Sequence, residues 1–390
     1  MATERYLINA VLEDLARKMV FIGGPRQVGK TTFAREVIAS HFKHIGYFNW
    51  DNRDHRHSIM NGIWPGEADL LIFDEIHKYR KWKQMVKGYY DVLQDRFRFL
   101  VTGSARLDIY RKGGDSMLGR YHYYRLHPFS LAEACQANSE ISIFNPLDIP
   151  TKHEHDLLLS LIKFGGFPEP FLGQSSRGLR RWHNEKADRL FREDIRDAGR
   201  VRDIVSMQLL GDMLPHRAGS RLSLNSLRED LEVSHRAITS WLEILESFYY
   251  CFRIFPFVSR RFRALKKEAK LYLWDWSEIP DSGARFENCI GSHLLKFAHF
   301  LYDHEGYRAD LYYLRSAEKK EVDFLFTIDG KPWFAVEVKV NETSVAPTLL
   351  YYKHKLAIPF CYQVVQKPGI DILKDGVRVV SADRFLLSLI

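Results

Sequence analysis

The sequence predicts an α/β protein: a parallel sheet first, then a helical module with a winged-helix pattern, then a second α/β domain. Three observations lead to this fold class. A glycine-rich loop near the N-terminus lies between an expected strand and an expected helix. Apolar runs of strand length follow it, and each ends in polar residues, as buried parallel strands do. A helix and several strands with spaced carboxylates occupy residues 271–390.

Length and composition set broad limits on the protein. A chain of 390 residues is expected to form two to three domains. The net charge of +8 favours an anionic partner, and nucleic acid is one candidate. The four cysteines are far apart in the sequence, which argues against a zinc knuckle or a disulfide framework and indicates a reducing cytoplasm. The sequence contains neither a signal-peptide core nor an apolar run of about 18 residues, so no membrane span is expected.

The motif G-x-x-x-x-G-K-[ST] occurs at residues 24–31, after an apolar strand and before residues with helical spacing. Its glycines allow backbone N–H groups to turn inward around phosphates, and the helix N-terminus adds a positive dipole end. We expect Lys30 to neutralise phosphate charge and Thr31 to hold the Mg²⁺ of bound ATP. The predicted nucleotide-binding residues are Gly24, Pro25, Arg26, Gln27, Val28, Gly29, Lys30, Thr31 and Thr32.

Residues 68–75 form a continuous apolar run that ends in Asp74 and Glu75, which is typical of a buried parallel strand. Asp74 is expected to hold Mg²⁺ through water. Glu75 is expected to polarise the attacking water as a general base. A plain helix N-cap after a strand is the alternative interpretation of these two acids.

A third apolar run, residues 97–104, ends in Thr102-Gly103-Ser104. This tripeptide alone would be a turn. Because the tripeptide follows the glycine-rich loop and the acidic strand in the sequence, it resembles the sensor-1 position of AAA-type P-loop ATPases. The resemblance implies that Ser104 or Thr102 contacts the γ-phosphate or the lytic water.

The chain as a whole resembles a prokaryotic family of AAA-type ATPases. The C-terminal part of that family is known as domain of unknown function 4143. The segments that carry the resemblance are residues 24–32, 74–75, 102–104, 119–120, 126–130 and 163–170. The resemblance implies a P-loop ATPase domain at 1–135, a helical and winged-helix module at 136–270, and a third domain at 271–390. ATP and Mg²⁺ are the implied cofactors.

AAA-type ATPases normally work as rings in which an arginine of one subunit reaches the nucleotide of the next. The resemblance therefore implies a homo-oligomer. Arg120 is the first candidate for this catalytic arginine and Arg106 the second, because a planar guanidinium can stabilise charge on a transferring phosphoryl group. A surface arginine or an ion pair is the alternative interpretation.

The middle of the chain has a helical pattern. Residues 180–200 are dense in arginine among acids, which favours a solvated helix with ion pairs over a phosphate-binding strip. Residues 223–246 follow a helix–turn–helix pattern with Ser234 as a cap, and the basic stretch 253–270 comes next. A recognition helix plus a basic hairpin is how a winged helix contacts DNA. Winged helices also serve as packing modules, and both interpretations stay open.

The C-terminal domain carries Glu287 on an expected helix and Asp323, Glu337 and Lys339 on expected strands. Strand alternation places Glu337 and Lys339 on one face. This order resembles the PD-(D/E)XK core of restriction-endonuclease-like domains. It implies Mg²⁺ or Mn²⁺ shared by Asp323 and Glu337, water activated by Lys339, and a site completed by Glu287. DNA cleavage and a catalytically silent docking role are both compatible with the pattern.

Together these patterns predict an Mg²⁺-dependent ATPase whose cycle moves a DNA-facing C-terminal half. The alternative is a nucleotide-regulated switch whose C-terminal domains only bind DNA or protein. A small-molecule kinase shares the loop but fits poorly with the large basic C-terminal half.

Overall fold

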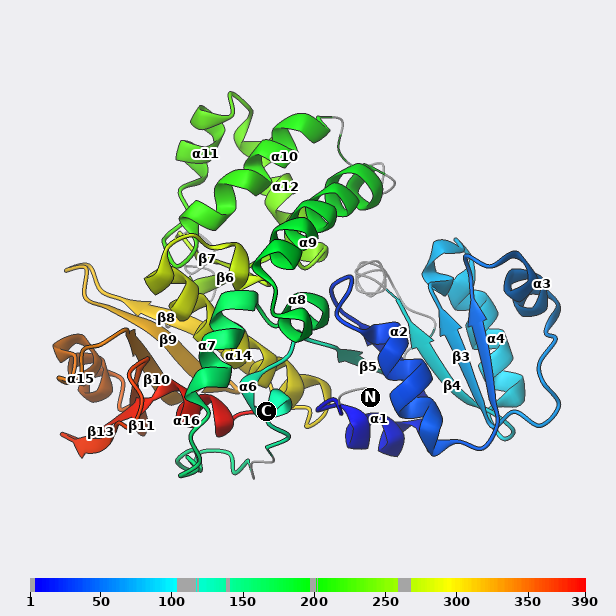
Figure 1. Ribbon diagram of the computed structural model, residues 1–390, viewed down its shortest axis with the longest axis horizontal. Coiled ribbons are helices and arrows are strands. Elements are labelled where there is room, and N and C mark those ends of the chain that lie inside the picture. Colours follow the sequence, from blue (N-terminus) through cyan, green and yellow to red (C-terminus); the bar gives the residue numbers. More distant parts are fainter. Residues whose placement is uncertain are drawn as a thin grey trace. The chain divides into compact units, whose positions relative to one another are not determined.

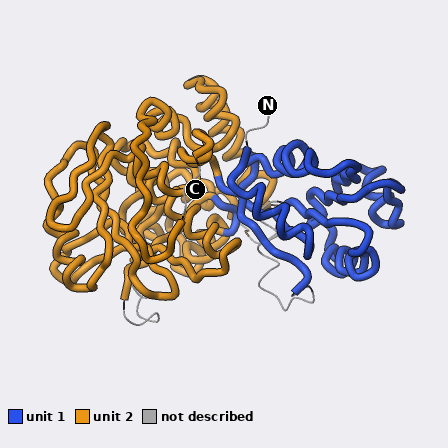
Figure 2. The backbone as a smooth tube through the Cα atoms, turned by 90° about the horizontal axis from the view of Figure 1, so that it is seen from below, with its two compact units in different colours: residues 1–127, 247–249 blue, residues 128–246, 250–390 orange. Residues whose placement is uncertain are grey.

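The computed structural model describes residues 4–103, 117, 119–137, 141–196, 201, 203–258 and 268–390. The chain forms two compact units (Figure 2). Unit 1 comprises residues 1–127 and 247–249, and unit 2 comprises residues 128–246 and 250–390. Within the described ranges, no helix is both long and apolar enough to cross a membrane.

Unit 1 is built on a five-stranded sheet with the order β2-β3-β4-β1-β5, in which all neighbours are parallel (Figure 1). The strands are β1 (Met19–Gly23), β2 (Ile45–Asn49), β3 (Leu70–Asp74), β4 (Arg98–Thr102) and β5 (Tyr121–Arg125). Every residue of β1 and β3 is buried, as the continuous apolar runs predict. The parallel α/β fold expected for the N-terminal part is therefore confirmed.

Helices lie on both sides of this sheet (Figure 1). They are α1 (Ile8–Leu15), α2 (Lys30–Thr32) with its π-helical continuation η1 (Phe33–Ile38), η2 (Ala39–His41), α3 (Arg53–Asn61), η3 (Ile76–Lys78) and α4 (Trp82–Leu93). Strand alternation sends Phe21 and Phe99 toward α4, where they pack on Trp82 and Tyr90. The strands are thereby held in register, and their carboxyl ends meet at one edge of the sheet.

Unit 2 begins with a helical stretch. Its helices are α6 (Leu131–Ala134), α7 (His155–Phe164), α8 (Pro168–Gly173), α9 (Ser176–Asp188), η5 (Arg189–Ile195), α10 (Ile204–Met213), η6 (Leu214–Arg217), α11 (Leu224–Asp230) and α12 (His235–Ser247). Ser234 caps α12 as predicted, since its Oγ accepts the N–H of Ala237 at 3.1 Å. Ile238, Leu242 and Leu245 are all buried and form the core face of α12.

The rest of unit 2 is a mixed eight-stranded sheet with the order β12-β13-β11-β10-β9-β8-β6-β7. The strands are β6 (Cys251–Pro256), β7 (Lys270–Leu273), β8 (Ala309–Arg315), β9 (Glu321–Ile328), β10 (Lys331–Lys339), β11 (Phe360–Val365), β12 (Asp371–Lys374) and β13 (Val377–Ser381). Its helices are η7 (Trp276–Glu278), α14 (Ser282–Asp303), α15 (Pro347–Lys355) and α16 (Ala382–Leu387). Strands β8, β9 and β10 form an antiparallel meander, and β10 pairs with β11 in parallel. The C-terminal part is therefore α/β, as expected.

Helix α14 positions the acidic residues of this half, because it packs closely against the sheet. Gly291 makes the approach possible: a Cβ there would lie 2.9 Å from the ring of Phe324 on β9. Two turns further on, Phe297 packs against Phe326 with ring centroids 5.2 Å apart. Glu287, one turn before Gly291, is thus carried close to β7 and β9.

A buried ion pair joins α14 to α6. The Nζ of Lys296 lies 2.5 Å from Glu133 Oε2 and 2.9 Å from Ser130 Oγ, and both charged side chains are 2% exposed. A buried charge is expensive unless a partner compensates it, so this pair fixes how the two helices dock.

The substitution Lys296→Met should destabilise unit 2 by about 3–5 kcal/mol, because it leaves the buried Glu133 carboxylate without its ammonium partner. Denaturant unfolding followed by tryptophan fluorescence measures the loss. The double variant Lys296→Met/Glu133→Gln, which removes both charges, should recover part of it. A single variant as stable as the wild type would contradict the structural role of this pair.

Candidate functional site

The glycine-rich loop lies between β1 and α2, and its backbone conformation requires glycine at both ends. Gly24 has φ of +141° and Gly29 has φ of +93°. A Cβ on Gly24 would also lie 2.4 Å from the carbonyl oxygen of Leu126. The loop therefore takes its shape from positions that only glycine fills without strain.

Lys30 is held inside this loop. Its Nζ donates to the carbonyl oxygens of Gly24 at 3.0 Å and Pro25 at 2.6 Å, and the residue is 8% exposed. The ammonium group is thus kept within the backbone turn that would surround phosphates. Lys30 is therefore positioned where it could contact an anion bound in the loop.

The carboxylate of Asp74, at the end of β3, accepts hydrogen bonds from three hydroxyl groups. Thr31 Oγ1 lies 2.9 Å and Tyr47 OH 2.8 Å from Oδ2, and Thr102 Oγ1 lies 2.6 Å from Oδ1. The register explains the meeting, because Asp74 pairs with Asn49 on β2 and with Thr102 on β4. Thr31 and Asp74, the predicted Mg²⁺ residues, are therefore brought together. Their hydroxyl and carboxylate oxygens are hard ligands that suit this ion.

Glu75 follows Asp74 in the left-handed region, with φ of +57°, which is uncommon for a residue other than glycine. Its Oε2 lies 3.5 Å from Lys78 Nζ and 3.6 Å from His77 Nε2. Among the described residues, its side chain makes no hydrogen bond that caps η3, the short helix that follows. The helix-cap interpretation of Glu75 therefore finds no support in the geometry.

Tyr47 and Asn49 were missed by sequence reasoning. They occupy alternate positions at the end of β2, so they share a face and both point to the Asp74 carboxylate. The Arg35 guanidinium lies 4.4 Å from the centroid of the Tyr47 ring, and burial raises the pKa of this tyrosine. The sequence did contain a signal for them: Tyr47 and Asn49 are polar residues at alternate positions where the strand ends.

The predicted sensor and arginine residues are only partly placed. Thr102 is in contact with Asp74, whereas Ser104 and Arg106 lie outside the described residues. Arg120 forms a two-point ion pair with Asp91 of α4, with Nε 2.6 Å from Oδ1. Because β5 is parallel to β1, Arg120 lies at the amino end of the strands, opposite the loop of its own chain.

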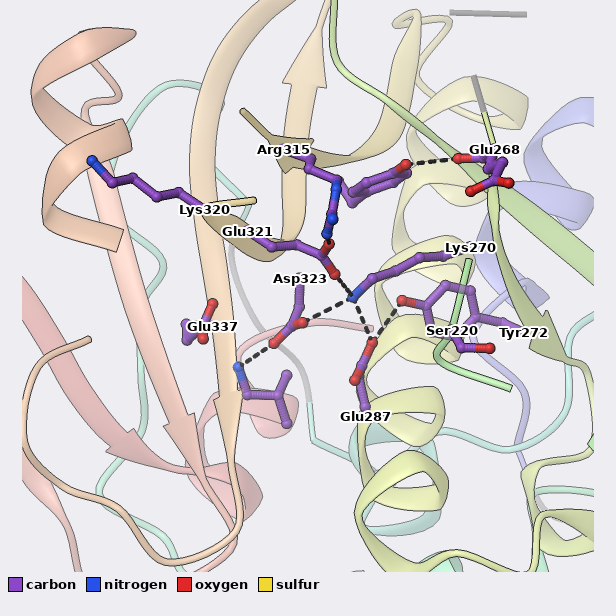
Figure 3. A network of polar contacts seen from close by, with 12 residues as sticks. Ser220, Glu268, Lys270, Tyr272, Glu287, Arg315, Lys320, Glu321, Asp323 and Glu337 are labelled. Carbon is purple, nitrogen blue, oxygen red and sulfur yellow. Dashed lines mark hydrogen bonds and ion pairs between the residues drawn. The ribbon is translucent and has the colours of Figure 1, made fainter. Parts of the chain in front are cut away.

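Three of the four predicted nuclease-like residues, Glu287, Asp323 and Glu337, lie near one another in unit 2, and a lysine that was not predicted there joins them (Figure 3). Lys270 reaches from β7 and places Nζ 3.2 Å from Glu287 Oε1, 2.9 Å from Glu321 Oε1 and 3.1 Å from Asp323 Oδ1. Burial alone would lower the pKa of Lys270. The carboxylates outweigh that effect and raise this pKa above its ordinary value.

Glu337 and Lys339 complete the group on β10. Lys339 Nζ lies 2.8 Å from Glu337 Oε1, and the backbone N–H of Val338 donates to Asp323 Oδ2 at 3.0 Å. Oε2 of Glu337 is buried and has no hydrogen-bond partner among the described residues. Burial, with a further contribution from Asp323, raises the pKa of Glu337 to about 7.

A second buried lysine among acids lies elsewhere in unit 2. Ligand atoms of His183, Asp275 and Glu278 lie within 4.8 Å of one another, a spacing that could hold a metal ion. The Nζ of Lys186, however, lies 3.2 Å from Asp275 Oδ2 and 2.6 Å from Glu278 Oε1. An ammonium already neutralises these carboxylates, so we interpret the group as an ion-pair network.

The predicted DNA-facing surface is described only in part. Helices α11 and α12 are followed by the β6–β7 pair, the order that a winged helix requires. Arg253 makes two 2.7 Å hydrogen bonds to Glu246, and Lys270 lies in the acidic group. The basic residues Arg260, Arg261, Arg263, Lys266 and Lys267 are outside the described residues.

Residues 16–135, which contain the loop and the Asp74 site, match the family described as AAA domain. The chain carries an AAA domain. Residues 155–277 match a domain of unknown function, number 8612, and residues 282–385 match domain of unknown function 4143. The resemblance noted in the sequence is thereby confirmed for the AAA domain and for domain 4143. The division at 135/136 and 270/271 stays a prediction.

Two relatives are both named as uncharacterized proteins. An uncharacterized protein of Methanocaldococcus jannaschii is 25% identical over 372 residues, which cover 88% of this chain and 80% of that protein. An uncharacterized protein of Mycobacterium tuberculosis is 22% identical over 389 residues, covering 92% of this chain and 81% of that protein.

Similar solved structures include the Orc1 protein of Aeropyrum pernix in complex with DNA. It is 14% identical, covers 74% of this chain and 92% of its own, and has a TM-score of 0.33. Another is the RuvB Holliday junction branch migration motor of Thermotoga maritima. It is 17% identical, covers 64% of this chain and 88% of its own, and has a TM-score of 0.28.

Replacement of Thr102 by valine in the AAA domain should lower the stability of unit 1 by about 1–3 kcal/mol, because the buried Asp74 oxygen loses its donor. Denaturant unfolding checks this value. Thr102→Ser is the matched control, since it keeps the hydroxyl and should retain the hydrogen bond. Equal losses in the two variants would show that the hydroxyl contributes little.

Proposed function

We propose that the AAA domain binds Mg²⁺–ATP at the loop of residues 24–31 and hydrolyses it. The observation that carries this proposal is the carboxylate of Asp74, which accepts hydrogen bonds from Thr31 of the loop and from Thr102 of β4. The phosphate-binding loop, the acidic strand end and the hydroxyl of the next strand thus form one contiguous site.

In this proposal the Lys30 ammonium leaves its carbonyl partners and neutralises charge on the β- and γ-phosphates. The oxygens of Thr31 and Asp74 would hold Mg²⁺, which supplies charge neutralisation on the transferring phosphoryl group. Glu75 accepts a proton from the water that attacks the γ-phosphorus while the bond to the bridging oxygen breaks. Ser104, beyond the end of β4, is the proposed contact to the γ-phosphate.

A second subunit is proposed to complete the site, as in the ring arrangement that the family resemblance implies. Arg120 or Arg106 would then reach a neighbouring nucleotide in a homo-oligomer. Arg120 must first leave Asp91, whose carboxylate accepts two of its hydrogen bonds. A guanidinium held in an exposed ion pair is released at small cost, because water screens the attraction between the two charges.

For unit 2 we propose binding of an anionic partner, with duplex DNA as the first candidate. The order of α11, α12 and the β6–β7 pair supports this proposal. The alternative is a nucleotide-regulated switch with a catalytically silent C-terminal domain that binds DNA or protein. The ammonium of Lys270 among the acids favours the silent form of that domain.

The variant Glu75→Gln should still bind ATP while its hydrolysis rate falls roughly 10²–10⁴-fold, because the amide cannot accept the proton. Phosphate release and fluorescent-nucleotide binding measure the two effects separately. Lys30→Ala serves as the comparison and should lose hydrolysis together with tight binding. Unchanged phosphate release by Glu75→Gln would exclude Glu75 as the base.

If DNA is the partner, duplex DNA should change the rate of ATP hydrolysis at low salt, and the effect should fade as salt rises, because phosphate contacts release counterions. Arg236→Ala, at an exposed position of α12, should weaken the effect. Arg192→Ala is the control. It also removes one exposed arginine, which pairs with Asp188, but it lies outside α12. A rate that DNA leaves unchanged at every salt concentration would favour a protein partner.

A further inference from the structure

The acidic group of Glu287, Glu321 and Asp323 already contains a cation. The ammonium of Lys270 has three donor hydrogens, and it has three carboxylate partners at 2.9–3.2 Å. Its side chain is 4% exposed, so water contributes little to its solvation. Each donor is therefore matched by one acid, which is the complete set of bonds that a buried ammonium requires.

The strand that carries Lys270 fixes this position. Lys270 is the first residue of β7 and pairs with Ile254 of β6, and an isolated bridge also joins it to Arg221. Its side chain then extends toward α14 and β9 (Figure 3). The ammonium is thus anchored by the backbone of an edge strand, unlike the end of a freely moving surface lysine.

A divalent ion requires the space that Lys270 fills. Magnesium binds oxygen ligands at roughly 2.1 Å, and calcium at about 2.3–2.6 Å, so an ion bound by both Glu287 and Asp323 would have to lie where the ammonium of Lys270 contacts the same two carboxylates. Two cations cannot share that volume, and their mutual repulsion would be strong where burial limits screening. Glu321 also has a second cationic partner in Arg315, which further reduces the charge left for a metal.

A fourth acid, Glu337, lies next to the group and forms its ion pair with Lys339. Glu337 lies on β10 beside Asp323, it is 5% exposed, and its Oε2 has no hydrogen-bond partner among the described residues. A buried carboxylate oxygen without a donor is unusual in a folded protein. Lys270 therefore compensates Glu287, Glu321 and Asp323, whereas Oε2 of Glu337 keeps its capacity to accept a hydrogen bond.

We infer that Lys270 is the resident cation of this group, and that the wild-type chain consequently binds no divalent metal ion at Glu287, Asp323 and Glu337. The residues predicted from the nuclease resemblance are present and close together, but the arrangement does not fit the metal. This inference concerns unit 2 alone and is independent of ATP hydrolysis in unit 1.

The test is Mn²⁺ binding to the nucleotide-free full-length chain, followed by the electron paramagnetic resonance signal of the free ion. Wild type and Asp323→Asn should give the same titration, because the group takes no metal in either. Lys270→Met, similar in size but uncharged, should gain one Mn²⁺ site with a dissociation constant below about 1 mM. The double variant Lys270→Met/Asp323→Asn should lose that site.

Lys339→Met is the matched control. It removes a positive charge at 2.8 Å from Glu337 but leaves Lys270 in place, and it should gain no Mn²⁺ site. Thermal unfolding supplies a second measurement: Mn²⁺ should raise the melting temperature of Lys270→Met and leave that of Lys339→Met unchanged.

Three results would overturn the inference. The first is Mn²⁺ binding by the wild type that Asp323→Asn abolishes. The second is a folded Lys270→Met variant that binds no Mn²⁺, and the third is an equal gain in Lys339→Met. If Lys270→Met does not fold, the comparison of wild type with Asp323→Asn decides on its own, since wild-type binding that depends on Asp323 contradicts a resident lysine.

Discussion

The proposed nucleotide site depends on how the buried carboxylate of Asp74 is solvated. The residue is 3% exposed, so the protein must replace the water that a charged group would otherwise bind. Hydroxyl groups from the loop, from β2 and from β4 do so. Each donor comes from a different segment, and the hydrogen bonds therefore hold the loop and two strand ends around one charge.

The buried carboxylates at Asp74 and around Lys270 both need partners that replace water, but the two sites use different kinds of partner. Neutral hydroxyls around Asp74 stabilise the charge without cancelling it, so the negative potential there remains available to a cation. The ammonium of Lys270 cancels charge directly, as does that of Lys186 beside Asp275 and Glu278. Carboxylates spaced closely enough to bind a metal therefore do not identify a metal site by themselves. The groups that donate hydrogen bonds to them must also be known, because an ammonium group takes the place of the metal.

The sequence was sufficient for the parts of the structure that local pattern determines. The two glycines of the motif, a lysine after them and an apolar strand ending in two acids predict the loop and β3, because backbone sterics and burial act within a few residues. Lys270 could not be placed in this way. In the sequence it is one member of a basic stretch, and only the pairing of β7 beside β6 brings it to Asp323, 53 residues away.

The arginine near the N-terminus gives the loop a mechanical connection to the rest of the chain. Arg5 donates to the carbonyl oxygen of Val28 in the phosphate loop at 2.9 Å and, through its other terminal nitrogen, to that of His127. His127 is the last residue of unit 1 before the chain continues into unit 2. A shift of the loop backbone at Val28 that keeps the first of these bonds therefore requires the Arg5 guanidinium to follow it. One buried guanidinium thus bonds both the glycine-rich loop and the last residue of unit 1 before the chain enters unit 2.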